Sequence, residues 1–284
     1  IVFTCQQTLL SHPSPCTFTL LFRVFGKGRS VLTLSLHRIY IISQTQEFIV
    51  QLDLHMKSNR YLRQLRVSGS RGTKCAEYIA GRIAASALLT SIDLQSNGIC
   101  SIGGQAIAEA IAHSASLTSI DLSRNDLGNE GGKHIAKAIA VSASLTSIDL
   151  NDNEIGAVGA EHIAQAISFS ASLTSVNLLR NVFNDEIVSM LLRLKEEQPS
   201  LLTLCGLELN ATEADFSSRN LNSNDAKLLA PEIAASASLT SVDIGYNRIG
   251  HEMVLKLVGV FKEKKMVSVG LADCTLGNDG AQGV

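Results

Sequence analysis

Residues 117–144 read LTSIDLSRNDLGNEGGKHIAKAIAVSAS, and this stretch decides the fold because it recurs almost unchanged on both sides. The 28 residues after it (145–172) read LTSIDLNDNEIGAVGAEHIAQAISFSAS, and the 28 before it (89–116) read LTSIDLQSNGICSIGGQAIAEAIAHSAS. A fourth copy starts at Leu173 with the same spacing. A fixed period between about 20 and 50 residues is typical of a solenoid, in which each repeat packs on its neighbours.

Each repeat has two halves with different hydrophobic periods. In the first half, Leu117, Ile120 and Leu122 end in an apolar–polar–apolar alternation, which indicates a short strand with one buried face. In the second half, Ile135 and Ile139 are four residues apart and share one face of a helix. Stacking such units predicts an α/β horseshoe, with parallel strands on the concave face and helices on the convex face.

An asparagine follows the strand at one position of the repeat. A buried amide there can bond the turn backbone of its own repeat and of the neighbouring repeat. We therefore predict a structural asparagine ladder, and the alternative is a row of ligand-binding amides. The ladder residues are Asn97, Asn125, Asn153, Asn181 and Asn247.

The pattern resembles the ribonuclease-inhibitor class of leucine-rich repeats over about residues 62–284. The resemblance is carried by the 117–122 strand pattern, Asn125, Leu127-Gly128 and the Ile-Ala stripe at 135–139. The class includes ribonuclease inhibitor, the sensor domains of NLR-type receptors and Ran GTPase-activating protein. The resemblance implies protein–protein recognition on the concave face or its rim, but a fold does not assign a function.

The chain departs from the repeat at its ends and in its second half. Residues 1–30 do not fit, and both extra strands and an irregular leader stay open. We expect a degenerate first repeat at 31–61 and clear repeats over 62–284, the last one truncated. The unit at 201–238 is ten residues longer than the period, which places an insertion near 207–215. Such an insertion is either a tolerated bulge or a functional loop.

Composition narrows the function classes. A net charge of −2 and a pI near 6.4 give no electrostatic footprint for nucleic acid. The six cysteines form no C-x-x-C pair, so we expect reduced thiols in a cytoplasmic protein rather than zinc or disulfides. No apolar run reaches the roughly 18 residues of a membrane helix, so we expect no membrane contact.

Chemical motifs are weak. The segment 69–74 superficially echoes a phosphate-binding loop but lacks the G-x-x-x-x-G-K-[ST] pattern. His134 and His162 stack on successive helices near Glu161, yet a closed zinc site needs four ligands. We favour solvated histidines, and we predict no catalytic residue, no metal and no cofactor.

The concave face carries two sets of candidate partner-binding residues. One is an acidic column, which suits a basic partner or is a solvated feature copied with the repeat; its charges repel and raise carboxylate pKa values. The other set follows the strands and includes Arg and Tyr, which are enriched in binding hot spots. The column is Asp93, Asp121 and Asp149, continued by Asp243, and the second set is Arg124, Asp152, Arg180 and Tyr246.

We therefore predict a monomeric, non-enzymatic scaffold that binds a protein partner through the concave face or rim. One alternative is a GTPase-activating module similar to the Ran activator, in which a rim arginine acts on phosphate charge. Arg124, Arg180 and Arg248 are candidates by position. The other alternative is the sensor part of a larger NLR-like receptor.

Overall fold

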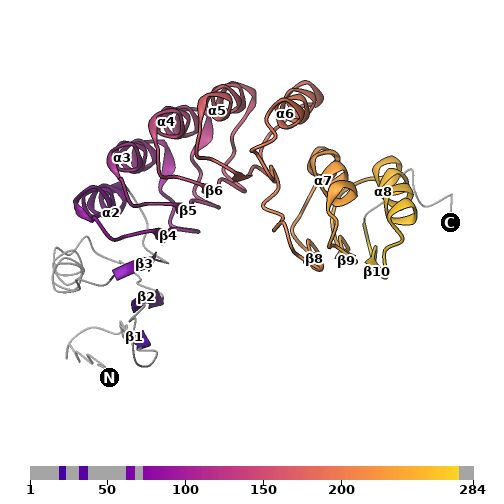
Figure 1. The fold of residues 1–284 in the computed structure, drawn as a ribbon, viewed down its shortest axis with the longest axis horizontal. Helices are drawn as coiled ribbons and strands as arrows, with labels where there is room; N and C mark the ends of the chain where they lie inside the picture. Colours follow the sequence, from indigo (N-terminus) through magenta and orange to yellow (C-terminus); the bar gives the residue numbers. More distant parts are fainter. Residues whose placement is uncertain (1–18, 24–31, 38–61, 68–72, 275–284) are drawn as a thin grey trace, which may run out of the picture.

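The computed structural model describes residues 19–23, 32–37, 62–67 and 73–274. From α2 (Thr73–Ala85) onward, strands and helices alternate along an arc, with the helices on its outer side and the strands on its inner side (Figure 1). The α/β solenoid expected from the 28-residue period is confirmed.

From β4 onward the elements repeat the same three-residue strand, and the helices all have about four turns. The strands are β1 (Thr19–Arg23), β2 (Leu32–His37), β3 (Leu62–Val67), β4 (Ser91–Asp93), β5 (Ser119–Asp121), β6 (Ser147–Asp149), β7 (Ser175–Asn177), β8 (Glu213–Asp215), β9 (Ser241–Asp243) and β10 (Ser268–Gly270). After α2, the helices are α3 (Cys100–His113), α4 (Gly128–Val141), α5 (Ala157–Phe169), α6 (Asp185–Glu197), α7 (Ser223–Ala235) and α8 (His251–Lys264).

Equivalent residues of successive repeats lie beside one another in the parallel sheet. Ile92 pairs with Ile120, which pairs with Ile148, and all three side chains are buried. The helical stripe, represented by Ile135 and Ile139, is buried against the strands. The core is therefore one continuous apolar layer between the strands and the helices.

Small residues let neighbouring helices approach closely. Gly103, Gly131 and Gly159 occupy one position in three successive repeats, and all three are buried. A Cβ added at Gly103 would lie 2.8 Å from the side chain of Ala76 on the preceding helix. A buried alanine occupies another position of the same helices. We call these two positions the glycine column and the alanine column; the alanine column is Ala110, Ala138 and Ala166.

The asparagine side chains tie the turns together. Asn125 is fully buried, and its Nδ2 donates to the carbonyls of Leu94 and Leu122, both at 2.9 Å. Its Oδ1 accepts from the backbone N–H of Asn97 at 2.9 Å. Asn153, Asn181 and Asn247 make corresponding bonds to carbonyls of their own and the preceding repeat.

The N-terminal strands extend the sheet. β1 lies within the 1–30 segment and pairs antiparallel with β2, which is one of the two possibilities that the sequence leaves open. β2 pairs parallel with β3, as the strand of a first repeat would. The helix expected for that repeat within 38–61 lies outside the described residues, as does the part of the last truncated unit from 275 onward, beyond its strand β10.

The sheet is divided between β7 and β8. Strands β1 to β7 form one sheet and β8 to β10 form another (Figure 1). Thr203 and Cys205 continue the first sheet only as isolated bridges to β7. The chain then begins a full 28-residue repeat at Ala211, whose strand is β8.

The predicted position of the insertion is therefore wrong in part, since β8 occupies residues 213–215. The ten extra residues are 201–210, which supply the strand position of a repeat without its helix. The asparagine ladder breaks here as well, because Arg219 stands at the asparagine position. Its backbone N–H still donates to Asn247 Oδ1 at 3.1 Å.

Candidate functional site

The second set of predicted residues shares an unusual backbone conformation. Arg124, Asp152, Arg180 and Tyr246 have φ values of 58°, 57°, 60° and 56°, in the left-handed region that non-glycine residues rarely adopt. The turn is stabilised across repeats, because the N–H of Arg124 donates to the carbonyl of Asn151 at 2.9 Å. The repeat thus forces one side chain per turn into a fixed position at the end of each strand.

Three of these residues form an ion-paired row across adjacent repeats. Arg180 Nη1 lies 2.8 Å from Asp152 Oδ2, and Arg124 Nε lies 3.8 Å from the same oxygen. The side chains of Arg124, Asp152 and Arg180 are 50%, 30% and 21% exposed. Exposed ion pairs contribute only about 0–1 kcal/mol, so the main effect of these contacts is orientation. We call these three residues the strand-end row.

Tyr246 lies apart from the strand-end row. It follows β9 in the second sheet, beyond the division between β7 and β8, and its side chain is 62% exposed. The structure therefore does not bring all four residues of the set together.

The carboxylates of the acidic column form hydrogen bonds within the turns that follow the strands. Oδ1 of Asp93, Asp121 and Asp149 accepts a hydrogen bond from the backbone N–H two residues further on, at 3.1, 2.8 and 2.8 Å. Asp93 also pairs with Arg66 at 2.8 Å. This structural role adds a third explanation for the column, beside a basic partner and simple solvation, because such bonds stabilise the turn that ends the strand.

The middle of the column is electrostatically strained. Burial, together with the smaller effect of the neighbouring charge of Asp121, raises the pKa of Asp149 to about 6. Burial also raises the pKa of Asp121, and Asp93 adds a smaller effect in the same direction. The direction agrees with the rise expected from like charges, but desolvation is the larger cause.

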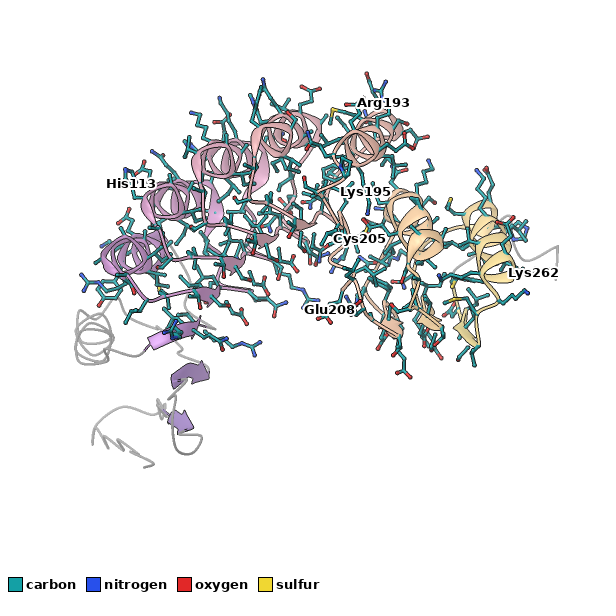
Figure 2. All side chains as sticks on the ribbon, viewed as in Figure 1. His113, Arg193, Lys195, Cys205, Glu208 and Lys262 are labelled. Carbon is teal, nitrogen blue, oxygen red and sulfur yellow. The ribbon has the colours of Figure 1, made fainter. Side chains whose placement is uncertain are left out.

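Sequence reasoning missed two buried carboxylates at the division of the sheet. Glu232 stands in the alanine column of α7, with its side chain only 3% exposed. Its carboxylate accepts from Thr203 Oγ1 at 2.6 Å, from the backbone N–H of Leu204 at 2.5 Å and from Lys195 Nζ at 2.8 Å. Glu232 thereby ties α7 to the end of α6 and to residues 203–205, which we call the bridge segment. We call the region where α6, the bridge segment and α7 meet the junction. Lys195 and Cys205 lie there in Figure 2.

Asp225 is the second missed carboxylate and stands in the glycine column. Its Oδ1 accepts from the backbone N–H of Arg180 at 2.6 Å, and its Oδ2 accepts from that of Asn222 at 2.9 Å, within a helix capping box. Burial raises the pKa of Asp225. The junction therefore directly supports the turn that carries the last arginine of the strand-end row. Alignment of the repeat from Ala211 would have exposed both acidic substitutions.

Within the described parts of the chain, no group of three or more His, Cys, Asp or Glu side chains is arranged to hold a metal ion. No helix in the same residues is long and apolar enough to cross a bilayer.

The comparisons with known proteins agree with the repeat. A family model described as "Leucine Rich repeat" matches residues 85–108, 113–136, 141–164 and 235–256. A search of curated proteins gives no match.

Three solved structures are similar at low identity. The actin-binding site 2 of leiomodin-1 is 16% identical over 55% of this chain and 92% of that chain, with a TM-score of 0.43. The tropomodulin C-terminal domain of Caenorhabditis elegans is 10% identical over 67% and 93%, with a TM-score of 0.38. An internalin from Listeria monocytogenes is 15% identical over 75% and 68%, with a TM-score of 0.32.

The narrower resemblance to the ribonuclease-inhibitor class, with its NLR and Ran activator members, stays a prediction. The recurring strand and helix and the matched segments together show that the chain has the fold of a leucine-rich-repeat solenoid.

Proposed function

We propose that the protein is a non-enzymatic interaction scaffold that binds a protein partner through the strand-end row. The observation that carries the proposal is the position of Asp152, whose carboxylate contacts arginines from the repeats on both sides. The row contains two guanidinium groups and one carboxylate, so it presents a net positive charge. Guanidinium groups bind carboxylates in a two-pronged geometry, which favours acidic side chains on the partner.

The row is held in place before any partner arrives. The side chain of Arg180 is ion-paired to Asp152, and its backbone is held by Asp225. Immobilising a flexible side chain on binding costs about 0.5–1.5 kcal/mol, and prior ordering reduces that cost. Arg124 is less tightly paired and half exposed, which leaves its guanidinium accessible.

The cellular setting belongs to the same proposal. We place the protein in the cytoplasm as a monomer. Cys100, Cys205 and Cys274 are free thiols, which supports a reducing compartment. Burial raises the pKa of Cys205 well above its ordinary value, so this thiol stays neutral inside the junction.

Affinity capture from a native lysate tests the proposal. The wild-type chain is compared with an Arg124→Ala/Arg180→Ala double variant and with Arg193→Ala, which removes an exposed arginine from the outer helix α6. We expect the double variant to lose partners that wild type and Arg193→Ala retain. Equal recovery by all three proteins would refute binding through the row. Tyr246→Ala, measured separately, shows whether the second sheet contributes.

The GTPase-activating alternative has its own measurement. Hydrolysis of GTP by candidate small GTPases is followed with the purified chain and with the Arg124, Arg180 and Arg248 single alanine variants. For a non-enzymatic scaffold, we expect no stimulation of GTP hydrolysis. Stimulation that disappears with one of these arginines would instead identify a catalytic module, since an arginine finger contributes about 10³–10⁵-fold.

A further inference from the structure

The two strand edges that face the division of the sheet differ. On one side, the bridge segment around Thr203 bonds to β7, because the N–H of Val176 donates to the Thr203 carbonyl at 3.0 Å and that of Leu178 to the Leu204 carbonyl at 2.9 Å. The outer edge of this segment is capped by side chains. The N–H of Leu204 donates to Glu232, and those of Cys205 and Leu207 both donate to Thr203 Oγ1 at 3.0 Å.

On the other side, β8 bonds only to β9 within the described residues. The N–H of Phe216 donates to the Asp243 carbonyl at 2.7 Å, and the Thr212 carbonyl accepts from the N–H of Thr240 at 2.9 Å. Alternate residues of a strand direct their backbone groups to opposite sides. The N–H and carbonyl groups of Glu213 and Asp215 therefore face away from β9, toward the division. We call this side of the strand the β8 edge.

In the continuous first sheet, residues at the repeat position of Asp215 have backbone hydrogen-bond partners that the β8 edge lacks. Asp121 and Asp149 hold the repeat position of Asp215, and their carbonyls accept from the N–H groups of Leu94 and Leu122 at 2.8 and 2.9 Å. No described residue donates to the Asp215 carbonyl. Glu213 and Asp215 are also exposed, whereas the first and third residues of β4 to β7 are half-buried.

We propose that the β8 edge is a docking strand for an extended, basic segment of a partner protein. The segment would add to the three-stranded sheet through backbone hydrogen bonds, the mode by which peptides extend exposed sheet edges. This second binding surface is separate from the strand-end row.

The negative charge around the β8 edge favours a basic partner segment. The carboxylates of Glu213 and Asp215 flank the edge, Asp243 follows on β9, and Glu208 lies on the segment that leads into β8 (Figure 2). Side chains of an added strand lie about 5 Å from those directly opposite, so lysine or arginine at alternate positions pairs with the two carboxylates. One cation is already near, since Arg219 lies over the ring of Phe216 at 5.2 Å. The β8 edge of a second copy would bring like charges together, which disfavours self-pairing.

Peptide binding to the full chain tests the inference. The probe is a fluorescent heptapeptide with alternating lysine and valine, and its glutamate–valine counterpart serves as the comparison peptide. Glu213→Pro removes one N–H from the β8 edge without removing a bond to β9, and proline is tolerated at such edge positions. Glu213→Gln/Asp215→Asn removes the charges and keeps the backbone. Glu161→Gln, an exposed carboxylate on α5, is the matched control.

We expect the lysine peptide to bind wild type and Glu161→Gln equally, and the glutamate peptide to bind neither. Dissociation constants should rise about tenfold in Glu213→Pro and in the charge variant, as the loss of one bond or of the paired charges implies. A thermal melt of Glu213→Pro checks that it is folded. Failure of the lysine peptide to bind wild type, or binding of that peptide to both edge variants with the wild-type dissociation constant, would overturn the proposal.

Sedimentation of the peptide-free chain distinguishes a second copy from a partner. Dimers of wild type that vanish in Glu213→Pro would show that the edge pairs with itself, which overturns the basic occupant. None of these readouts depends on Arg124 or Arg180, so this inference and the proposed function fail independently.

Discussion

The carboxylate of Asp225 accepts a hydrogen bond from the backbone N–H of Arg180 at 2.6 Å, although the two residues are 45 positions apart. In the preceding repeats, the N–H at the position of Arg180 donates to a carbonyl of the next repeat, as Arg124 does to Asn151. A side chain of α7 thus replaces the missing strand partner at the junction.

Asp225→Ala should lower the free energy of unfolding by about 1–3 kcal/mol, because the Arg180 N–H and the N-terminus of α7 lose a buried acceptor. Urea unfolding followed by circular dichroism measures the change. Asp185→Ala is the control, since Asp185 is an exposed partner of Lys227 and its loss should cost under about 1 kcal/mol. Equal stability of the two variants would contradict the role of Asp225.

Glu232→Ala should cost more, about 3–5 kcal/mol, although three other repeats carry alanine in this column. The substitution leaves Lys195 without its carboxylate partner and leaves the Leu204 N–H and the Thr203 hydroxyl without an acceptor. A double-mutant cycle with Lys195→Met isolates the ion pair. If Glu232→Ala is as stable as wild type, the carboxylate does not hold the junction.

Asn125→Ala should destabilise the chain by about 1–3 kcal/mol, because three carbonyls and the Asn97 N–H lose a buried partner. The melting temperature reports the effect. Asn210→Ala, at an exposed position in the connecting segment, should leave it nearly unchanged. An unaltered melt of Asn125→Ala would show that the amide is dispensable.

The acidic column should make stability fall as pH rises from about 4 to about 6. Asp149 has a folded pKa of about 6 against an ordinary value of 3.8, so in this range the folded chain binds more protons than the unfolded chain. Asp149→Asn should flatten this part of the profile and stabilise the protein at pH 7. Asn177 shows that an amide fits the position, since its Oδ1 accepts from the Leu179 N–H at 3.2 Å. Added salt should also raise the melting temperature at pH 7 by screening the repulsion. A profile unchanged by Asp149→Asn would refute the assignment.

The sequence was sufficient for the repeating architecture because the strand and helix patterns recur at one spacing, and each repeat adds independent support. It was insufficient at the junction for a physical reason. Ala211 and Ala214 replace the large apolar residues that mark a strand start, so the register of that repeat was hidden. The pairing of Arg124, Asp152 and Arg180 depends on contacts between side chains of different repeats, and the amino-acid sequence alone does not show such contacts.

The division of the sheet also has a consequence for how the molecule melts. In a solenoid, cooperativity passes only between neighbouring repeats, each interface adding its own coupling energy. Elsewhere that coupling comes from a shared apolar core and a continuous ladder, but between α6 and α7 it depends strongly on Glu232 and Asp225. Removing both carboxylates in a Glu232→Ala/Asp225→Ala double variant should therefore uncouple the array, so that the repeats before and after the junction unfold in two separate steps.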